Sequence, residues 1–119
     1  MYDRDYIKQN SYESDFGVKH HFSDSVYAKQ LHLPKGHIAL SHKHKYSHLS
    51  VLAAGSCKLY REIDGKVIET KHKAPDVIDI PAGIEHQVEA TEDVTWLCIH
   101  ATTETDPDKI DKVVVCESD

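Results

Sequence analysis

Four histidines stand at spacings that could bring their imidazoles onto one metal ion. His42 and His44 are two residues apart, and His48 follows at the same parity. Side chains at i and i+2 of a β-strand share a face, with Cα atoms roughly 6.5–7 Å apart. Metal–nitrogen bonds of about 2.0–2.1 Å let two imidazoles converge across that gap. With His86 supplied by a second strand, the sequence predicts one divalent ion bound by four histidines.

The chemistry of such a site follows from its charge. Four neutral imidazoles leave the ion its full 2+ charge, which makes it a strong Lewis acid for anionic or enolate-like ligands. Imidazole suits Fe, Ni, Cu and Zn, and we expect Mn to be accepted as well. An octahedral ion would keep two open positions for substrate or O₂, whereas a tetrahedral zinc would be saturated and mainly structural.

Two other interpretations compete for the histidine pattern. A strand whose alternate histidines face water would have the same sequence. A helical metalloprotease site is excluded, because Lys45 stands where the His-Glu-x-x-His pattern between His44 and His48 needs its glutamate. The first interpretation stays open at the level of sequence.

The elements that must position the histidines are strands. Residues 37–54 alternate with period two, and Gly55 ends the run. Asp64-Gly65 separates two strand-like runs and predicts a tight hairpin. The expected strands, closely spaced with turn residues between them, indicate an all-β sandwich or barrel: Val26–Leu33, 37–54, Cys57–Ile63, Lys66–Lys71, Val77–Ile80, His86–Thr91 and Val94–Ala101.

The chain length of 119 residues fits one domain. We expect an irregular N-terminal arm over 1–24, a barrel domain over 25–105 and a C-terminal tail over 106–119. Asp106 as N-cap and Pro107 at the first helical position predict a short helix in that tail.

Composition limits the partners. The formal net charge is −6 without a basic cluster, which argues against nucleic acid. The sequence contains no long apolar run, so we expect neither a membrane span nor a secretory leader. Three cysteines without a Cys-x-x-Cys pattern favour the reducing cytoplasm.

The spacing of the first histidine cluster resembles the first conserved motif of the cupin superfamily. That motif has Gly, five residues, His-x-His, three or four residues, Glu, six residues and Gly. The chain matches every spacing, with histidine in the glutamate position: Gly36-x5-His42-x-His44-x3-His48-x6-Gly55.

A second cupin motif is matched at its centre by Pro81-x-Gly83-x2-His86. Pro75 stands where the family has its first Gly, and Ala90 where it has Asn. The 25 residues between Gly55 and Pro81 fit the usual separation of the two motifs.

The resemblance implies a cupin-type double-stranded β-helix, a jelly-roll barrel, in the small single-domain (monocupin) subgroup with a four-histidine site. It makes His42, His44 and His86 metal ligands and puts His48 in the glutamate position, which removes a glutamate base or anionic ligand from the mechanism. It also implies a homodimer.

Three functions are compatible with this site. The first is a metal-dependent, dioxygenase-like oxygenase acting on a small enol, diketone or other chelating anion. The second is a non-redox isomerase or lyase that uses the metal as a Lewis acid. The third is a module that binds a metal or small ligand without turnover.

Tyr46, Trp96 and Cys98 are candidates for lining the pocket. Trp96, Cys98 and His100 share one face of the Val94–Ala101 strand, and Tyr46 has the parity of the ligands. The simpler interpretation makes Cys98 a buried core residue. The other places Cys98 or Trp96 beside the metal, where either side chain could be oxidised.

Overall fold

The computed structural model describes residues 2–3, 17–40, 46–103, 105–106 and 108–109. Within these residues the secondary structure consists of strands, and none of it is a helix that could cross a membrane. The strands are β1 (Lys19–Ser23), β2 (Val26–Leu33), β3 (Ile38–Leu40), β4 (His48–Ala54), β5 (Ser56–Ile63), β6 (Lys66–Lys73), β7 (Asp76–Ile80), β8 (Glu85–Ala90) and β9 (Val94–Ala101).

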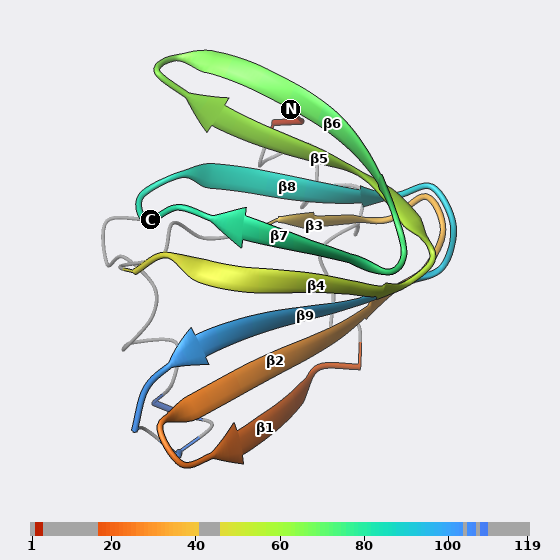
Figure 1. Cartoon of the computed structure of the whole chain (residues 1–119). Helices are drawn as coiled ribbons and strands as arrows, with labels where there is room; N and C mark the ends of the chain where they lie inside the picture. The colour runs from red at the N-terminus through yellow and green to blue at the C-terminus, as the bar shows by residue number, and fades with distance from the viewer. Residues whose placement is uncertain (1, 4–16, 41–45, 104, 107, 110–119) are drawn as a thin grey trace.

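These strands form two sheets that face each other (Figure 1). The first sheet has the order β1-β2-β9-β4-β7, and the second sheet has the order β3-β8-β5-β6. Neighbouring strands within both sheets are antiparallel. Consecutive strands β3 and β4 lie in different sheets, as do β7 and β8, so the chain crosses between the two layers. The predicted all-β jelly-roll barrel is confirmed.

The hairpin between β5 and β6 turns at Asp64 and Gly65, as predicted. Their φ angles are 52° and 76°, and two positive φ values in succession define a type I′ turn. Asp-Gly suits this turn because Gly has no Cβ, and Asp tolerates the left-handed region better than most residues. The turn sets the register of β5 against β6.

Strand β1 corrects the expectation of an irregular arm over 1–24. Lys19–Ser23 pairs with β2 along its full length at the edge of the first sheet. Four of its five side chains are exposed, so the strand has no buried face to produce an apolar alternation. Backbone pairing forms it, and hydrophobic periodicity does not report backbone pairing.

A second part of the arm also contacts the barrel. The Tyr2 N–H donates to Gln87 Oε1 at 2.8 Å, and Gln87 Nε2 donates to the Tyr2 carbonyl at 2.6 Å. The Tyr2 ring packs edge-on against Tyr60, and both tyrosine hydroxyls donate to the carboxylate of Glu89. Tyr2 therefore covers the outer face of the second sheet, where Gln87 is fully buried.

The helix predicted after Asp106 falls largely outside the described residues. Asp106 itself behaves as an N-cap would, because its Oδ1 accepts a hydrogen bond from the Asp108 N–H at 2.9 Å. The helix stays a prediction.

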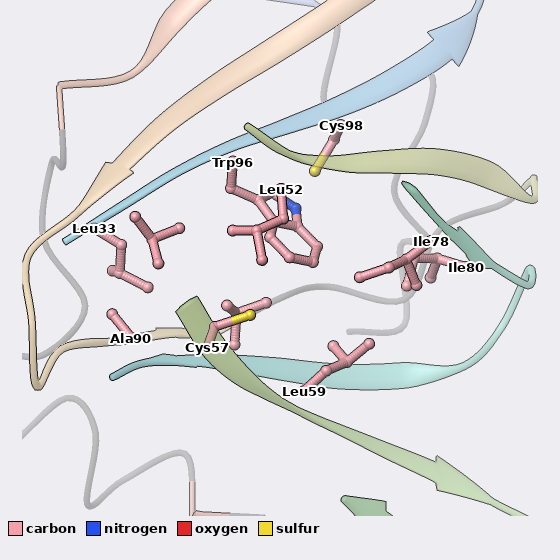
Figure 2. Packing of buried hydrophobic residues seen from close by; sticks show 11 residues of the cluster. Leu33, Leu52, Cys57, Leu59, Ile78, Ile80, Ala90, Trp96 and Cys98 are labelled. Atoms are coloured by element: carbon pink, nitrogen blue, oxygen red, sulfur yellow. The ribbon is translucent and has the colours of Figure 1, made fainter. Parts of the chain in front are cut away.

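The core lies between the two sheets (Figure 2). It is built from alternate residues of both sheets, and Trp96 is its largest side chain. The members are Leu33, Leu52, Cys57, Leu59, Ile78, Ile80, Val88, Ala90, Val94, Trp96 and Cys98. This core fills the interior beside the histidines described below, and it supports the strands that carry them.

Candidate metal centre

The structure brings two of the four predicted ligands together. His48 is the first residue of β4 in the first sheet, and His86 lies on β8 in the second sheet. Their side chains are 4% and 2% exposed, and their ring centroids lie 6.2 Å apart. His42 and His44 lie outside the described residues, so their placement stays a prediction.

Local sequence explains why both rings point inward. His48 alternates with Ser50 and Leu52, which are also buried, while Leu49 between them is exposed. On β8, His86 has the parity of the core residues Val88 and Ala90. Period-two alternation therefore carries each histidine into the space between the sheets.

His100 is a third buried imidazole that the histidine motifs do not include. It lies near the end of β9, is 6% exposed, and its ring centroid lies 4.5 Å from that of His48. The Tyr27 ring stacks on its other side at 5.9 Å. The sequence feature that indicates its inward direction is strand alternation, because His100 shares a strand face with Trp96 and Cys98.

These separations suit a shared ion. Two imidazoles on one metal, each with a bond of about 2.0–2.1 Å, have ring centres roughly 4.5–6.4 Å apart for bond angles of about 90° to about 180°. Both His48–His86 and His48–His100 fall in this range. Among the described residues, however, no group of three or more His, Cys, Asp or Glu side chains is arranged to hold a metal. The predicted four-histidine site also includes His42 and His44, which lie outside the described residues.

The electrostatics favour the ligand form of His48. Burial lowers the pKa of His48 from 6.5 to about 4, and the neighbouring His100 contributes in the same direction. The imidazole is therefore neutral at pH 7 and has a lone pair to donate. A neutral donor set is the one that preserves the charge of a bound 2+ ion.

The predicted pocket-lining residues lie in two different places. Trp96 and Cys98 belong to the core cluster (Figure 2), and the Ser50 hydroxyl contacts the Cys98 thiol at 3.9 Å. Burial raises the pKa of Cys98, so the thiol stays protonated. Tyr46 is exposed and lines a hollow of about 200 Å³ together with Ser47, His100 and Ala101.

A second hollow, of about 300 Å³, is lined by Ser47, His48 and His100 among others. Both hollows share His100 and Ser47. The larger hollow opens on the outer face of the first sheet, because the outward-facing Val26, Leu49 and Asp79 also line it. The smaller hollow, which Tyr46 lines, is the one that offers room for a small molecule beside His100.

No protein-family model and no curated protein matches the chain. Many solved structures do. A conserved protein of unknown function from Streptococcus pyogenes aligns with a TM-score of 0.54 at 16% identity, over 71% of this chain and 70% of that one. The oxalate decarboxylase of Lactobacillus farciminis, solved as a formate complex, aligns with a TM-score of 0.63 at 14% identity, over 89% of this chain.

Hydroxypropylphosphonic acid epoxidase from S. wedmorenis aligns with a TM-score of 0.55 at 7% identity, over 64% of this chain. The chain spans 36% of the length of the Lactobacillus decarboxylase and 43% of that of the epoxidase. At these identities the likeness shows the fold alone. The neighbours have the cupin fold, and this confirms the cupin-type barrel expected from the two motifs.

Proposed function

We propose that this cupin-fold protein binds one divalent transition metal ion on His42, His44, His48 and His86 and acts as a metal-dependent oxygenase. The observation that carries the proposal is the pair His48 and His86, which two opposite sheets present to each other in a buried space. A divalent ion shared with the adjacent His-x-His segment would fit this pair, because neutral imidazole nitrogens are common ligands of such ions.

The ion would be Fe, Mn, Ni, Cu or Zn, and when bound it would supply Lewis-acid and, if redox-active, oxygen chemistry. The chain's own residues would hold the ion, exclude bulk water through burial, and leave the hollow that Tyr46 and His100 line for the substrate. A small chelating or enolisable molecule would suit an ion that neutral histidines leave with its full 2+ charge.

The solved neighbours support a small anionic substrate. They include a decarboxylase of oxalate and an epoxidase of hydroxypropylphosphonic acid, and both compounds are small acids. An all-neutral histidine site also favours anions, because no ligand charge cancels that of the ion.

The test starts with the metal content of untagged protein. We expect one ion per chain, lost in His48→Ala and His86→Ala and retained in His32→Ala, which removes an exposed histidine of β2. Protein reconstituted with each of the redox-active metals is then assayed for O₂ uptake with a panel of chelating carbonyl compounds and carboxylates. Absence of uptake with every metal would end the oxygenase proposal.

A second candidate is a non-redox lyase or isomerase, and the presence of oxalate decarboxylases among the solved neighbours favours the lyase, because a decarboxylation consumes no external oxidant. Turnover of a panel substrate under anaerobic conditions would select this candidate. A bound, fully saturated tetrahedral zinc with no turnover in either assay would instead indicate a binding module.

Two further proposals concern the setting of the protein. We propose a reducing cytoplasmic location, supported by Cys57 and Cys98, which are free thiols. We also propose a homodimer, supported by exposed apolar side chains on the outer face of the first sheet. Sedimentation of the wild type and of variants in that face tests the dimer.

A further inference from the structure

Arg61 is a cation that the fold turns toward the interior of the barrel. It lies on β5 with the parity of Cys57 and Leu59, which are both core residues. Across the second sheet it stands directly opposite His86. Directly opposite residues on one sheet face have Cβ atoms about 4.5–5.5 Å apart, so the guanidinium and the His86 imidazole start from neighbouring positions on the same inner surface.

The hydrogen bonding of Arg61 is incomplete. Its Nε is buried and has no hydrogen-bond partner among the described residues, and its Nη2 reaches Thr70 Oγ1 only at the long distance of 3.5 Å. A guanidinium carries five N–H donors and no acceptor. Within the described part of the chain, no carboxylate forms an ion pair with Arg61.

The Thr70 hydroxyl that Arg61 reaches is already committed elsewhere. Thr70 Oγ1 lies 2.7 Å from His72 Nε2, and His72 Nδ1 lies 2.6 Å from Asp76 Oδ2. With the His72 Nδ1–H donating to Asp76, the Thr70 hydroxyl donates to Nε2 and keeps its lone pairs for Arg61. The carboxylate of Asp76 thus accepts its hydrogen bond from His72. Thr70, His72 and Asp76 form a hydrogen-bonded row, the His72 row, which contacts Arg61 without neutralising its charge.

We infer that Arg61 binds the carboxylate of a small organic acid, a substrate class that rests on the proposed metal site. A buried donor without an acceptor is destabilising, and a planar carboxylate matches the guanidinium fork with two parallel hydrogen bonds. A carboxylate on Arg61 would place the adjoining carbons of a short acid beside His86. Arg61 is then a specificity residue, and the His72 row positions it.

The test uses full-length, metal-free, ¹⁵N-labelled protein and the side-chain N–H signals of arginine. The chain has two arginines, Arg4 and Arg61, so Arg61→Lys identifies the Arg61 Nε–H signal by its loss. Acetate is the carboxylate probe, inorganic phosphate the competing anion and sodium chloride the ionic-strength control. We expect a saturable shift of the Arg61 signal with acetate, and a weaker response to phosphate.

Affinities are then compared between variants from the backbone amide shifts of β5 and β8. Arg61→Gln should bind acetate at least roughly tenfold more weakly, because one charge-assisted, bidentate contact is lost. Arg61→Lys keeps the charge without the fork and should lie between. The matched control is Lys58→Gln, which removes the same charge from the outward parity of the same strand and should stay within about twofold of the wild type.

Three results would overturn the inference: a wild type that does not respond to acetate, tighter binding of phosphate than of acetate, or Arg61→Gln with unchanged affinity. If Arg61→Gln does not fold, Arg61→Lys decides by the same criterion. Metal affinity is measured on the same variants. A wild type that binds no metal would contradict the proposed function. Unchanged metal binding together with unchanged acetate affinity in Arg61→Gln would contradict only this inference.

Discussion

At the scale of single residues, the three buried imidazoles differ in their neighbours and in whether the motifs make them ligands. His48 and His86 face each other across the two sheets, while His100 lies between His48 and the Tyr27 ring. Only His48 and His86 belong to the motif spacings. His100 therefore stands as a neighbour that orients or shields His48, and a variant can separate this role from that of a ligand.

We expect His48→Ala to lower the metal stoichiometry below one ion per chain, and His100→Asn to retain one ion with an affinity reduced by about 10–100-fold. Residues that support a ligand from outside typically have an effect of that size. Metal analysis and calorimetric titration measure the two quantities. Loss of the ion in His100→Asn would make His100 a ligand.

Cys57 provides a prediction of pH dependence. Burial raises its pKa from 9.0 to about 11, and the nearby Asp76 carboxylate adds to the shift. At pH 8 the folded protein then has roughly 100-fold less thiolate at this position than an ordinary thiol. The rate of alkylation of Cys57 by iodoacetamide, followed by peptide mass spectrometry, should be lower by about that factor and rise tenfold per pH unit.

The sign for stability follows from the same shift. The folded state holds the Cys57 proton more tightly than the unfolded state, so this contribution is complete below pH 9.0 and is lost as the pH rises toward 11. Alkylation at pH 8 as fast in the native as in the urea-unfolded protein would contradict the buried placement.

At the scale of elements, the crossing from β4 to β5 depends on Gly55. Its φ is +86°, and a Cβ at this position would lie 2.0 Å from the backbone oxygen of Asp93. Backbone atoms of another loop cannot give way as a flexible side chain would. The close approach of the Gly55 turn to the Asp93 turn explains why a glycine is required at the last position of the first motif.

Gly55→Ala should therefore lower the free energy of unfolding by about 3 kcal/mol or more, because steric overlap adds to the strain of a positive φ. Gly36→Ala is the matched control. Gly36 has a φ of +85°, but no atom lies within 4 Å of the point that a Cβ would occupy there, so only the conformational cost of about 1–2 kcal/mol applies. Urea unfolding measures both, and equal losses would contradict the steric account.

At the scale of the whole molecule, the outer face of the first sheet is apolar at several exposed positions. Val26, Leu49 and Val77 are 43%, 48% and 62% exposed, and all three have the outward parity of their strands. Large exposed apolar patches mark association surfaces. An apolar face of this kind can pair with the same face of a second copy about a two-fold axis.

We expect the wild type to sediment as a dimer and Val77→Lys to shift it to the monomer without loss of the β-sheet circular dichroism. Val67→Lys makes the same change at a 50% exposed valine of β6, in the second sheet, and should leave the dimer intact. A monomeric wild type, or dissociation by both variants alike, would rule out this face as the interface.

What the sequence by itself determined is local in character. Alternation predicted β2 and β9 with their observed bounds, Asp64-Gly65 predicted the hairpin, and the motif spacing predicted that His48 and His86 would meet. Each of these depends on residues close in sequence or on the period of one strand. The placement of His42 and His44 stays a prediction, because they lie outside the described residues.

Only the tertiary structure decided which inward-facing side chains become neighbours. His100 approaches His48 because β9 pairs with β4, and Arg61 stands opposite His86 because β5 pairs with β8. Strand β1 exists through edge pairing of exposed residues. Parity is a property of one strand and can be seen in one sequence, but sheet order and register follow from the packing of the whole barrel, for which this sequence carries no local signal.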